Sequence, residues 1–594
     1  MAYNQYILVC GGTGCESSKA DDIYQNLKQS AEEHKVEKDV QIVKTGCFGF
    51  CEKGPICKVL PDESFYVEVK PEDAKDIIEE HVVKGRQVDR LLYKEEGTHA
   101  KSIENISFYQ KQVRIVLRNC GFINPENIEE YIAREGYAAL EKVLSEMKPQ
   151  DVIEELKASK IRGRGGAGFP TWKKWSFTKD VDADQKYIVC NADEGDPGAY
   201  MDRSVLEGDP HSVLEAMAIA GYTVGADKGF IYIRAEYPLA INRLEIAIAQ
   251  AREMGLLGNN ILGTDFSFDI EVRLGAGAFV CGEETALLAS IEGNRGMPVP
   301  RPPFPAVKGL WNQPTVINNV ETWANIPVII NRGGDWFAGI GTDKSTGTKV
   351  FALTGKINNS GLVEVPMGTP LKDIVYNIGG GIPKGKAFKA VQTGGPSGGV
   401  ITSDYIDVPI DYEHLAELGS IMGSGGMIVM DEDDCIVDVA KFYLGFTVEE
   451  SCGKCAPCRI GGRKLYNILD RITKGQSSMD ELETIKQIGH AMQRASLCGL
   501  GQTAPNPVLS SMKYFEDEYL AHIKDETCPS GVCKDLVHYE IDPEKCIGCG
   551  LCARKCPVNV ISGEKRQPYV IDQSGCIKCG ECYNACKFQA VLVK

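Results

Sequence analysis

Short runs of apolar residues alternate with polar stretches at the start of the chain. Residues 6–10 and 40–43 are continuous apolar runs that predict buried strands, and residues 20–35 between them have helical spacing. Glycines crowd the segment directly after the first run, at Gly11 and Gly12, which predicts a flexible loop there. The pattern therefore predicts a strand, a loop, a helix and a second strand in succession.

Helical and strand patterns return farther along the chain. Residues 151–159 have the apolar spacing of a helix, and residues 465–495 are amphipathic, which predicts a helical bundle. Residues 349–355 and 370–381 predict strands and a helix between glycine turns. The polar, charged segment 94–104 predicts a linker.

Length and composition limit the possible classes of protein. A chain of 594 residues with 43% hydrophobic content is long enough for about four domains of ordinary size. No stretch approaches the roughly twenty apolar residues that cross a bilayer, so we expect no direct membrane insertion. The net charge of −17 and the lack of a basic tract argue against nucleic acid as a partner. Twenty-three cysteines without an export signal indicate metal in a reducing compartment, and we expect a cytoplasmic protein.

Eight cysteines near the end of the chain form two copies of one pattern. The spacing is that of a ferredoxin with two [4Fe–4S] clusters, in which the fourth cysteine of each run binds the cluster of the other run. A disulfide scaffold needs export, and a zinc knuckle needs only two cysteines from each side, so both alternatives explain the pattern less well. The two runs are Cys546, Cys549, Cys552 and Cys556, then Cys576, Cys579, Cys582 and Cys586.

Two further cysteine sets predict clusters. Cys10 and Cys15, with Cys47 and Cys51, follow the two predicted strands at the start of the chain and resemble the thioredoxin-like [2Fe–2S] ferredoxins. A thioredoxin-type redox pair is the alternative, but this segment has no Cys-x-x-Cys. The second set predicts a [4Fe–4S] cluster, with three thiolates on one tight loop and a distant fourth, and consists of Cys452, Cys455, Cys458 and Cys498.

The remaining cysteines divide into buried thiols and a candidate zinc site. Cys528, Cys533 and the nearby His538 could supply three ligands of a structural zinc, and loose thiols on a linker are the alternative. Five others stand in apolar surroundings or after a turn and are expected to be small buried residues: Cys57, Cys120, Cys190, Cys281 and Cys435.

A glycine-rich loop spans residues 162–170 and formally contains G-x-G-x-x-G. A Rossmann fold would require a strand before this loop, whereas Val152, Ile153 and Leu156 predict a helix. Free backbone N–H groups without side chains still allow a phosphate or a flat ring to approach closely.

The glycine loop and four later motifs occur in a familiar order. The motifs 175–177, 189–194, 279–285 and 317–322 follow it, and together they resemble the NADH-binding flavoprotein subunit of respiratory complex I and related diaphorase subunits over residues 105–515. Asp196 departs from the glutamate that is frequent in the respiratory proteins.

The resemblance implies a set of cofactor contacts. The FMN contacts would be Gly163, Arg164, Gly165, Gly166, Lys174, Asn191, Asp193, Glu194, Gly282, Asn318 and Asn319. The residues around NADH would be Phe169, Phe177 and Phe304, stacked on the adenine, with Glu283 and Glu284 lining the cleft. In the family, the cluster of Cys452 is the first acceptor of electrons from FMN.

We therefore expect a multidomain α/β and α+β protein with five parts. We assign no chemistry to the ubiquitin-like insert, which is the third part. The parts are a thioredoxin-like [2Fe–2S] ferredoxin at 1–95, an FMN/NADH-binding domain at 105–345, a ubiquitin-like insert at 346–428, a helical bundle with a [4Fe–4S] cluster at 429–535, and a ferredoxin with two [4Fe–4S] clusters at 536–594.

The joined parts predict an NAD-linked oxidoreductase. A flavin can accept hydride from NADH and pass single electrons to clusters, so no general acid or base is required and no catalytic side chain is predicted. The thioredoxin-like domain at the front of the chain and the two-cluster ferredoxin at its end resemble the β subunit of trimeric NAD-dependent [FeFe]-hydrogenases, including electron-bifurcating ones. That resemblance implies three partners: a catalytic [FeFe]-hydrogenase subunit, a small thioredoxin-like [2Fe–2S] subunit and, in bifurcation, soluble ferredoxin.

Two alternatives to that function stay open. One is the diaphorase β subunit of an NAD-dependent formate dehydrogenase, and the other is a non-catalytic scaffold that only conducts electrons. Acidic Glu283 and Glu284 would repel the 2′-phosphate of NADP, whereas Arg301 could attract it, and we expect NAD to be preferred.

Overall fold

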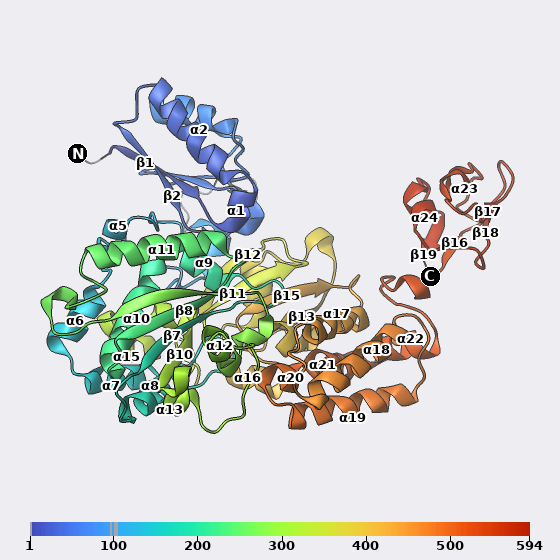
Figure 1. Cartoon of the computed structure of the whole chain (residues 1–594). Coiled ribbons are helices and arrows are strands. Elements are labelled where there is room, and N and C mark those ends of the chain that lie inside the picture. Colours follow the sequence, from blue (N-terminus) through green and yellow to red (C-terminus); the bar gives the residue numbers. More distant parts are fainter. Residues whose placement is uncertain (1–2, 96–97, 100–104, 594) are drawn as a thin grey trace. The chain divides into compact units, whose positions relative to one another are not determined.

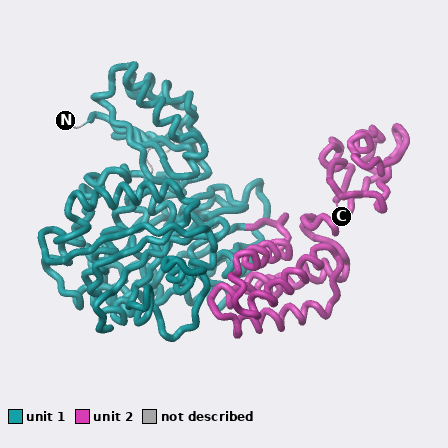
Figure 2. The backbone as a smooth tube through the Cα atoms, viewed as in Figure 1, with its two compact units in different colours: residues 1–429 teal, residues 430–594 magenta. Residues whose placement is uncertain are grey.

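The computed structural model describes residues 3–95, 98–99 and 105–593. Most of the predicted linker, at 96–97 and 100–104, lies outside the described residues. The chain divides into two compact units, Met1–Val429 and Met430–Lys594 (Figure 2). The division falls at the predicted start of the helical bundle. No helix in the described part of the chain is long and apolar enough to cross a membrane.

The first part of unit 1 is a four-stranded sheet in the order β2-β1-β3-β4. Strand β1 (Gln5–Cys10) pairs in parallel with β2 (Val40–Thr45), and helix α2 (Ala20–Glu33) connects them (Figure 1). Strands β3 (Cys57–Leu60) and β4 (Ser64–Tyr66) complete the sheet. The predicted strands and helix are confirmed, and Cys10 and Cys47 both lie where parallel strands end.

The centre of unit 1 is a parallel sheet in the order β10-β7-β8-β9. Its strands are β7 (Tyr187–Ala192), β8 (Lys228–Arg234), β9 (Asp269–Gly275) and β10 (Thr315–Asn319). The helices that share its core include α7 (Pro149–Ser159), α8 (Thr171–Asp180), α9 (Met201–Gly208), α10 (Pro210–Val224), α11 (Pro238–Glu253) and α14 (Val320–Arg332). Helix α12 (Glu284–Ile291) follows β9 in the chain. Helix α7 confirms the helix predicted before the glycine loop.

The insert is a five-stranded sheet in the order β12-β11-β15-β13-β14. Strand β11 (Thr348–Gly355) lies between β12 (Gly361–Pro366) and β15 (Gly426–Asp431), and β13 (Phe388–Thr393) and β14 (Val400–Thr402) follow. Its apolar residues share one buried cluster with the first domain, because Phe351 and Val363 pack with Phe48 and Phe65. The insert and the thioredoxin-like domain are therefore held together by a common core.

Unit 2 begins with a helical bundle and ends with a small cysteine-rich fold. The bundle contains α17 (Ile436–Glu449), α18 (Gly462–Ile472), α19 (Asp480–Ala495), α21 (Asn506–Tyr514) and α22 (Glu516–Lys524). The end of the chain pairs β16 (Tyr539–Ile541) with β19 (Val591–Val593) and β17 (Ile561–Ser562) with β18 (Val570–Ile571), and adds α23 (Leu551–Lys555) and α24 (Glu581–Ala585).

Candidate functional site

The glycine loop connects α7 to α8 and exposes bare backbone. Gly166 and Gly168 have φ of +115° and +62°, a region that side chains disfavour. A Cβ at Gly165 would lie 3.1 Å from the Cβ of Asn319, and one at Gly166 would lie 3.1 Å from the Cα of Gly423. Side chains here would fill the space beside the loop, so the loop suits a flat ring or a phosphate at close range.

Three asparagines stand at one edge of the central sheet, beside this loop. Asn191 and Asn319 are direct partners in the register of β7 and β10, at the carboxyl ends of the strands, and Asn318 precedes Asn319. Ligands of parallel sheets bind at these ends. Asn191 donates to the carbonyl of Gly282 at 2.9 Å. The structure thus gathers Asn191, Gly282, Asn318 and Asn319 as the resemblance implies.

Lys174 brings a cation to the same edge. Its Nζ donates to the carbonyl of Ile317 at 2.7 Å, and burial lowers the pKa of the ammonium group. A buried ammonium group is a suitable partner for an anionic or electron-rich ligand.

Carboxylates lie behind the asparagines. Glu194 accepts hydrogen bonds from the amides of Asp202 (3.0 Å) and Arg203 (3.1 Å), and burial raises the pKa of Glu194 to about 7. Asp202 accepts from Asn319 Nδ2 at 2.5 Å and from the amide of Glu321 at 3.3 Å. Glu321 forms a fully buried ion pair with Lys349 of the insert.

The insert contacts the glycine loop directly, although its sequence indicated no chemistry. Gly423 forms a backbone bridge with Gly166, and Tyr412 Oη donates to the carbonyl of Gly163 at 2.7 Å. Arg162 pairs with Glu413 at 2.6 Å and lies over the ring of Tyr412, 4.2 Å from its centroid. The insert therefore packs against the glycine loop and helps to hold its backbone in place.

The predicted nucleotide residues are all at least partly exposed, and Glu283 and Glu284 lie at the start of α12. Phe169, Phe177 and Phe304 are 46%, 52% and 55% exposed, so their faces are free to stack on a planar ligand. Glu283 is the N-cap of α12 and accepts from the amides of Thr285 and Ala286. Glu284 pairs with Arg301. Glu283 thus has a structural role besides any contact with nucleotide.

The four N-terminal cysteines come together at the ends of β1 and β2. The thiol of Cys10 interacts with those of Cys15 and Cys47, and Cys47 interacts with Cys51. The four thiols are therefore neighbours in the order Cys15, Cys10, Cys47 and Cys51. A [2Fe–2S] site requires such a grouping of thiolates from two loops.

The cysteines of unit 2 gather in three places that match the predicted clusters. A Cβ at Gly501, three residues after Cys498, would lie 2.9 Å from the Cβ of Cys458, so the segment that carries Cys498 packs against the tight loop. One cavity in the terminal fold is lined by Cys546, Cys549, Cys552 and Cys586, and a second by Cys556, Cys576, Cys579 and Cys582. Each cavity contains the first three cysteines of one run and the fourth cysteine of the other run, as the sequence predicts.

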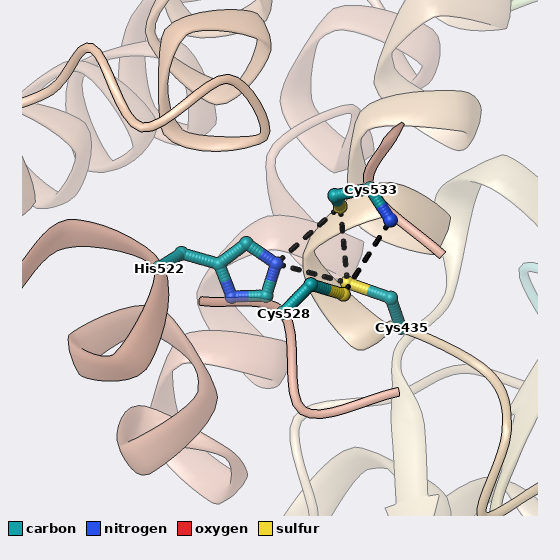
Figure 3. Close-up of side chains that lie close together, drawn as sticks. All are labelled: Cys435, His522, Cys528 and Cys533. Atoms are coloured by element: carbon teal, nitrogen blue, oxygen red, sulfur yellow. Dashed lines mark hydrogen bonds between the residues drawn. The ribbon is translucent and has the colours of Figure 1, made fainter. Parts of the chain in front are cut away.

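A fourth group in unit 2 differs from the expected zinc ligands. Cys435, His522, Cys528 and Cys533 are all buried, their ligand atoms lie within 4.8 Å of one another, and they point toward a common centre (Figure 3). His522 Nε2 lies 3.3 Å from Cys435 Sγ and 3.4 Å from Cys533 Sγ.

The surroundings of this group suit a cation. His522 Nδ1 lies 2.7 Å from the carbonyl of Glu518, which orients the ring and directs Nε2 inward. Hydrogen bonds with the thiols of Cys435 and Cys533 lower the pKa of Cys528. Three thiols and one imidazole are the donor set of many structural zinc sites.

The structure therefore corrects two expectations. His538 is exposed and outside the group, and Cys435, expected to be only a small buried residue, belongs to it. Cys435 lies 87 residues before His522, so no short spacing could have indicated this pairing.

Five family profiles match parts of the chain. The Nuo51 FMN-binding domain matches residues 156–328, and the SLBB domain matches 350–401 within the insert. The thioredoxin-like [2Fe-2S] ferredoxin matches 3–82, the NADH-ubiquinone oxidoreductase-F iron-sulfur binding region 438–522, and the 4Fe-4S binding domain 539–562 and 569–592. These matches confirm the predicted fold class.

Three known proteins show how far the likeness extends. The NADP-reducing hydrogenase subunit HndC of Solidesulfovibrio fructosivorans is 63% identical over 77% of this chain and 94% of its own length. The F 2 subunit of the NADH-quinone oxidoreductase of Rhizobium meliloti is 44% identical over 70% of this chain and 99% of its own length. The crystal structure of an NAD+-reducing [NiFe]-hydrogenase in the H2-reduced state aligns with a TM-score of 0.62 and 26% identity, over 88% of this chain and 85% of that one. The chain therefore belongs to the oxidoreductase family that comprises the F subunits of NADH-quinone oxidoreductase and the diaphorase subunits of hydrogenases.

Proposed function

We propose that this chain exchanges hydride between NAD(H) and bound FMN, and exchanges the electrons one at a time with iron–sulfur clusters. The observation that carries the proposal is the bare glycine loop beside Asn191 and Asn319, with Lys174 at the same edge. Bound FMN supplies the chemistry that turns a two-electron hydride transfer into single-electron steps. The family to which the chain belongs supports this assignment.

The side chains of the site bind and orient. The bare backbone at Gly165 and Gly166 suits the phosphate, and the asparagines at the ends of β7 and β10 suit the polar edge of the ring. The exposed phenylalanines offer faces to the adenine of NADH, which brings the nicotinamide toward the flavin. We assign the four cluster sites one [2Fe–2S] and three [4Fe–4S] clusters.

We infer that the partner is a catalytic hydrogenase subunit of the [FeFe] type, together with a small thioredoxin-like [2Fe–2S] subunit. The relative HndC is a hydrogenase subunit, which favours hydrogenase over formate dehydrogenase. Electron bifurcation with soluble ferredoxin as a third partner is part of this proposal. A neighbouring gene that encodes hydrogenase cysteine motifs would support a hydrogenase partner. A neighbouring gene with a molybdopterin-enzyme pattern would contradict this proposal.

The decisive experiment uses the chain purified without oxygen. We expect bound FMN and NADH-dependent reduction of viologen. Gly166→Trp should abolish both, because a side chain at φ +115° would collide with Gly423. Glu284→Ala should keep FMN and raise the KM for NADH. Glu253→Ala, an exposed change at the end of α11, is the control and should leave both unchanged. Wild-type chain with neither flavin nor activity would favour a scaffold that only conducts electrons.

We further propose that Cys435, His522, Cys528 and Cys533 bind a structural zinc ion. A closed set of three thiolates and one imidazole leaves no position for substrate, so the ion would stabilise the bundle rather than react. Cys435 directly precedes α17, and His522 lies in α22, so one ion would fasten two helices and the loop that carries Cys528 and Cys533.

A further inference from the structure

Helix α9 contacts the N-terminal cysteine site with its first turn. Tyr200, directly before α9, places its hydroxyl 3.7 Å from Cys51 Sγ in a geometry that allows donation to sulfur. Arg203, one turn later, lies over the Tyr200 ring, 5.7 Å from its centroid. A hydrogen-bond donor from the flavin domain thus reaches a cysteine expected to bind the [2Fe–2S] cluster.

The last turn of α9 fixes both cysteine loops. Glu207, which is buried, accepts from the amide of Thr13 at 3.0 Å and also from its hydroxyl. A Cβ at Gly46 would lie 2.3 Å from the Cα of Gly208, so the backbones are in direct contact. Thr13 stands between Cys10 and Cys15, and Gly46 precedes Cys47. The helix therefore holds both loops that supply thiolates.

The opposite side of α9 belongs to the flavin site. Asp202 accepts from Asn319, and Glu194 accepts from the amides of Asp202 and Arg203. Both Asn319 and Glu194 are residues that we expect around FMN. One short helix consequently touches the cysteine loops and the residues of the flavin site.

We propose that Tyr200 tunes the N-terminal [2Fe–2S] cluster by donating a hydrogen bond to the Cys51 thiolate, and that α9 is the fixed junction across which single electrons pass between this cluster and FMN. The inference rests on the proposed function. In each step, reduced flavin loses one electron and one ferric ion of the cluster becomes ferrous, while Tyr200 keeps its proton. Reduction adds negative charge to the cluster, and a hydrogen bond to sulfur stabilises that charge, so Tyr200 raises the reduction potential.

The test compares Tyr200→Phe with wild type in the full chain loaded with its clusters. A potentiometric titration followed by electron paramagnetic resonance measures the midpoint potential of the [2Fe–2S] signal. We expect a more negative midpoint in Tyr200→Phe at unchanged iron content. Tyr222→Phe is the matched control, because it removes a hydroxyl that bonds the carbonyl of Met147, and it should leave the midpoint unchanged.

A second variant tests the junction. In Glu207→Gln the carboxylate that holds Thr13 becomes a neutral amide, and we expect rapid-freeze experiments with NADH to show slower appearance of the reduced [2Fe–2S] signal at an unchanged rate of flavin bleaching. An equal midpoint in Tyr200→Phe would overturn the tuning role, and an equal rate in Glu207→Gln would overturn the junction. Wild-type chain that binds FMN but gives no [2Fe–2S] signal would refute the inference and leave the NADH–FMN reaction standing. A wild-type chain that binds no FMN and does not react with NADH would instead refute the proposed function.

Discussion

The buried ion pair between Glu321 and Lys349 is expected to hold the insert against the flavin domain. The side chains are 1% and 0% exposed. Glu321 also accepts from the amide of Val350 at 2.9 Å, and Lys349 donates to the carbonyl of Ser424 at 2.5 Å. Lys349→Met would leave the buried carboxylate without its paired ammonium group, which costs about 3–5 kcal/mol when one partner of a buried pair is removed.

Differential scanning calorimetry measures this loss. For a large domain, about 2–4 °C of Tm corresponds to 1 kcal/mol, so the transition of the flavin domain should fall by about 6–20 °C. The double variant Glu321→Gln with Lys349→Met leaves no unpaired charge and should lose less than Lys349→Met alone. Lys84→Met breaks an exposed pair with Glu80 and should leave the transition unchanged. A single variant as stable as wild type, or a double variant less stable than the single one, would refute this reasoning.

Three further predictions concern the other sites. Elemental analysis should find zinc in the wild-type chain and in His538→Ala, but not in Cys435→Ser. Zinc retained in Cys435→Ser and lost in His538→Ala would contradict the proposed ligand set. Burial raises the pKa of Glu194 from 4.5 to about 7, so its charging opposes folding: the cost is absent below pH 4.5, grows as pH rises, and is complete above pH 7, at roughly 3 kcal/mol. Glu194→Gln should therefore flatten the dependence of Tm on pH over this range, and an unchanged profile would contradict this. Glu284→Gln should release Arg301 from its ion pair and lower the preference for NADH over NADPH in kcat/KM by roughly tenfold, with Glu253→Gln as the control; an unchanged preference would contradict the role of this pair.

The cysteine clusters could be predicted from sequence because most of their ligands are close in the chain. Cys452, Cys455 and Cys458 lie on one loop, so the spacing alone restricts the geometry. The helix before the glycine loop was predictable for a similar reason, since α7 carries its apolar residues at helical spacing. Local patterns of this kind depend little on the rest of the fold.

The sequence predicts Cys528 and Cys533 as zinc ligands, but Cys435, His522 and the role of the insert could not be predicted, because they depend on contacts between distant segments. Cys435 has the apolar surroundings of a buried thiol, and only the packing of α17 with α22 brings His522 to it. Proximity in sequence favoured His538, which lies on the surface. In the insert, Tyr412 follows no recognisable motif, yet its hydroxyl reaches the glycine loop across 249 positions of sequence.

These long-range contacts also explain why the glycine loop can remain so bare. A loop rich in glycine loses much conformational entropy on becoming ordered. Here the order is supplied from outside: Tyr412 and Glu413 of the insert hold Gly163 and Arg162, and Gly423 lies against Gly166. The insert in turn shares its core with the thioredoxin-like domain. The stability of the glycine loop should therefore depend on the insert as well as on the central sheet, from which Asn319 lies beside Gly165.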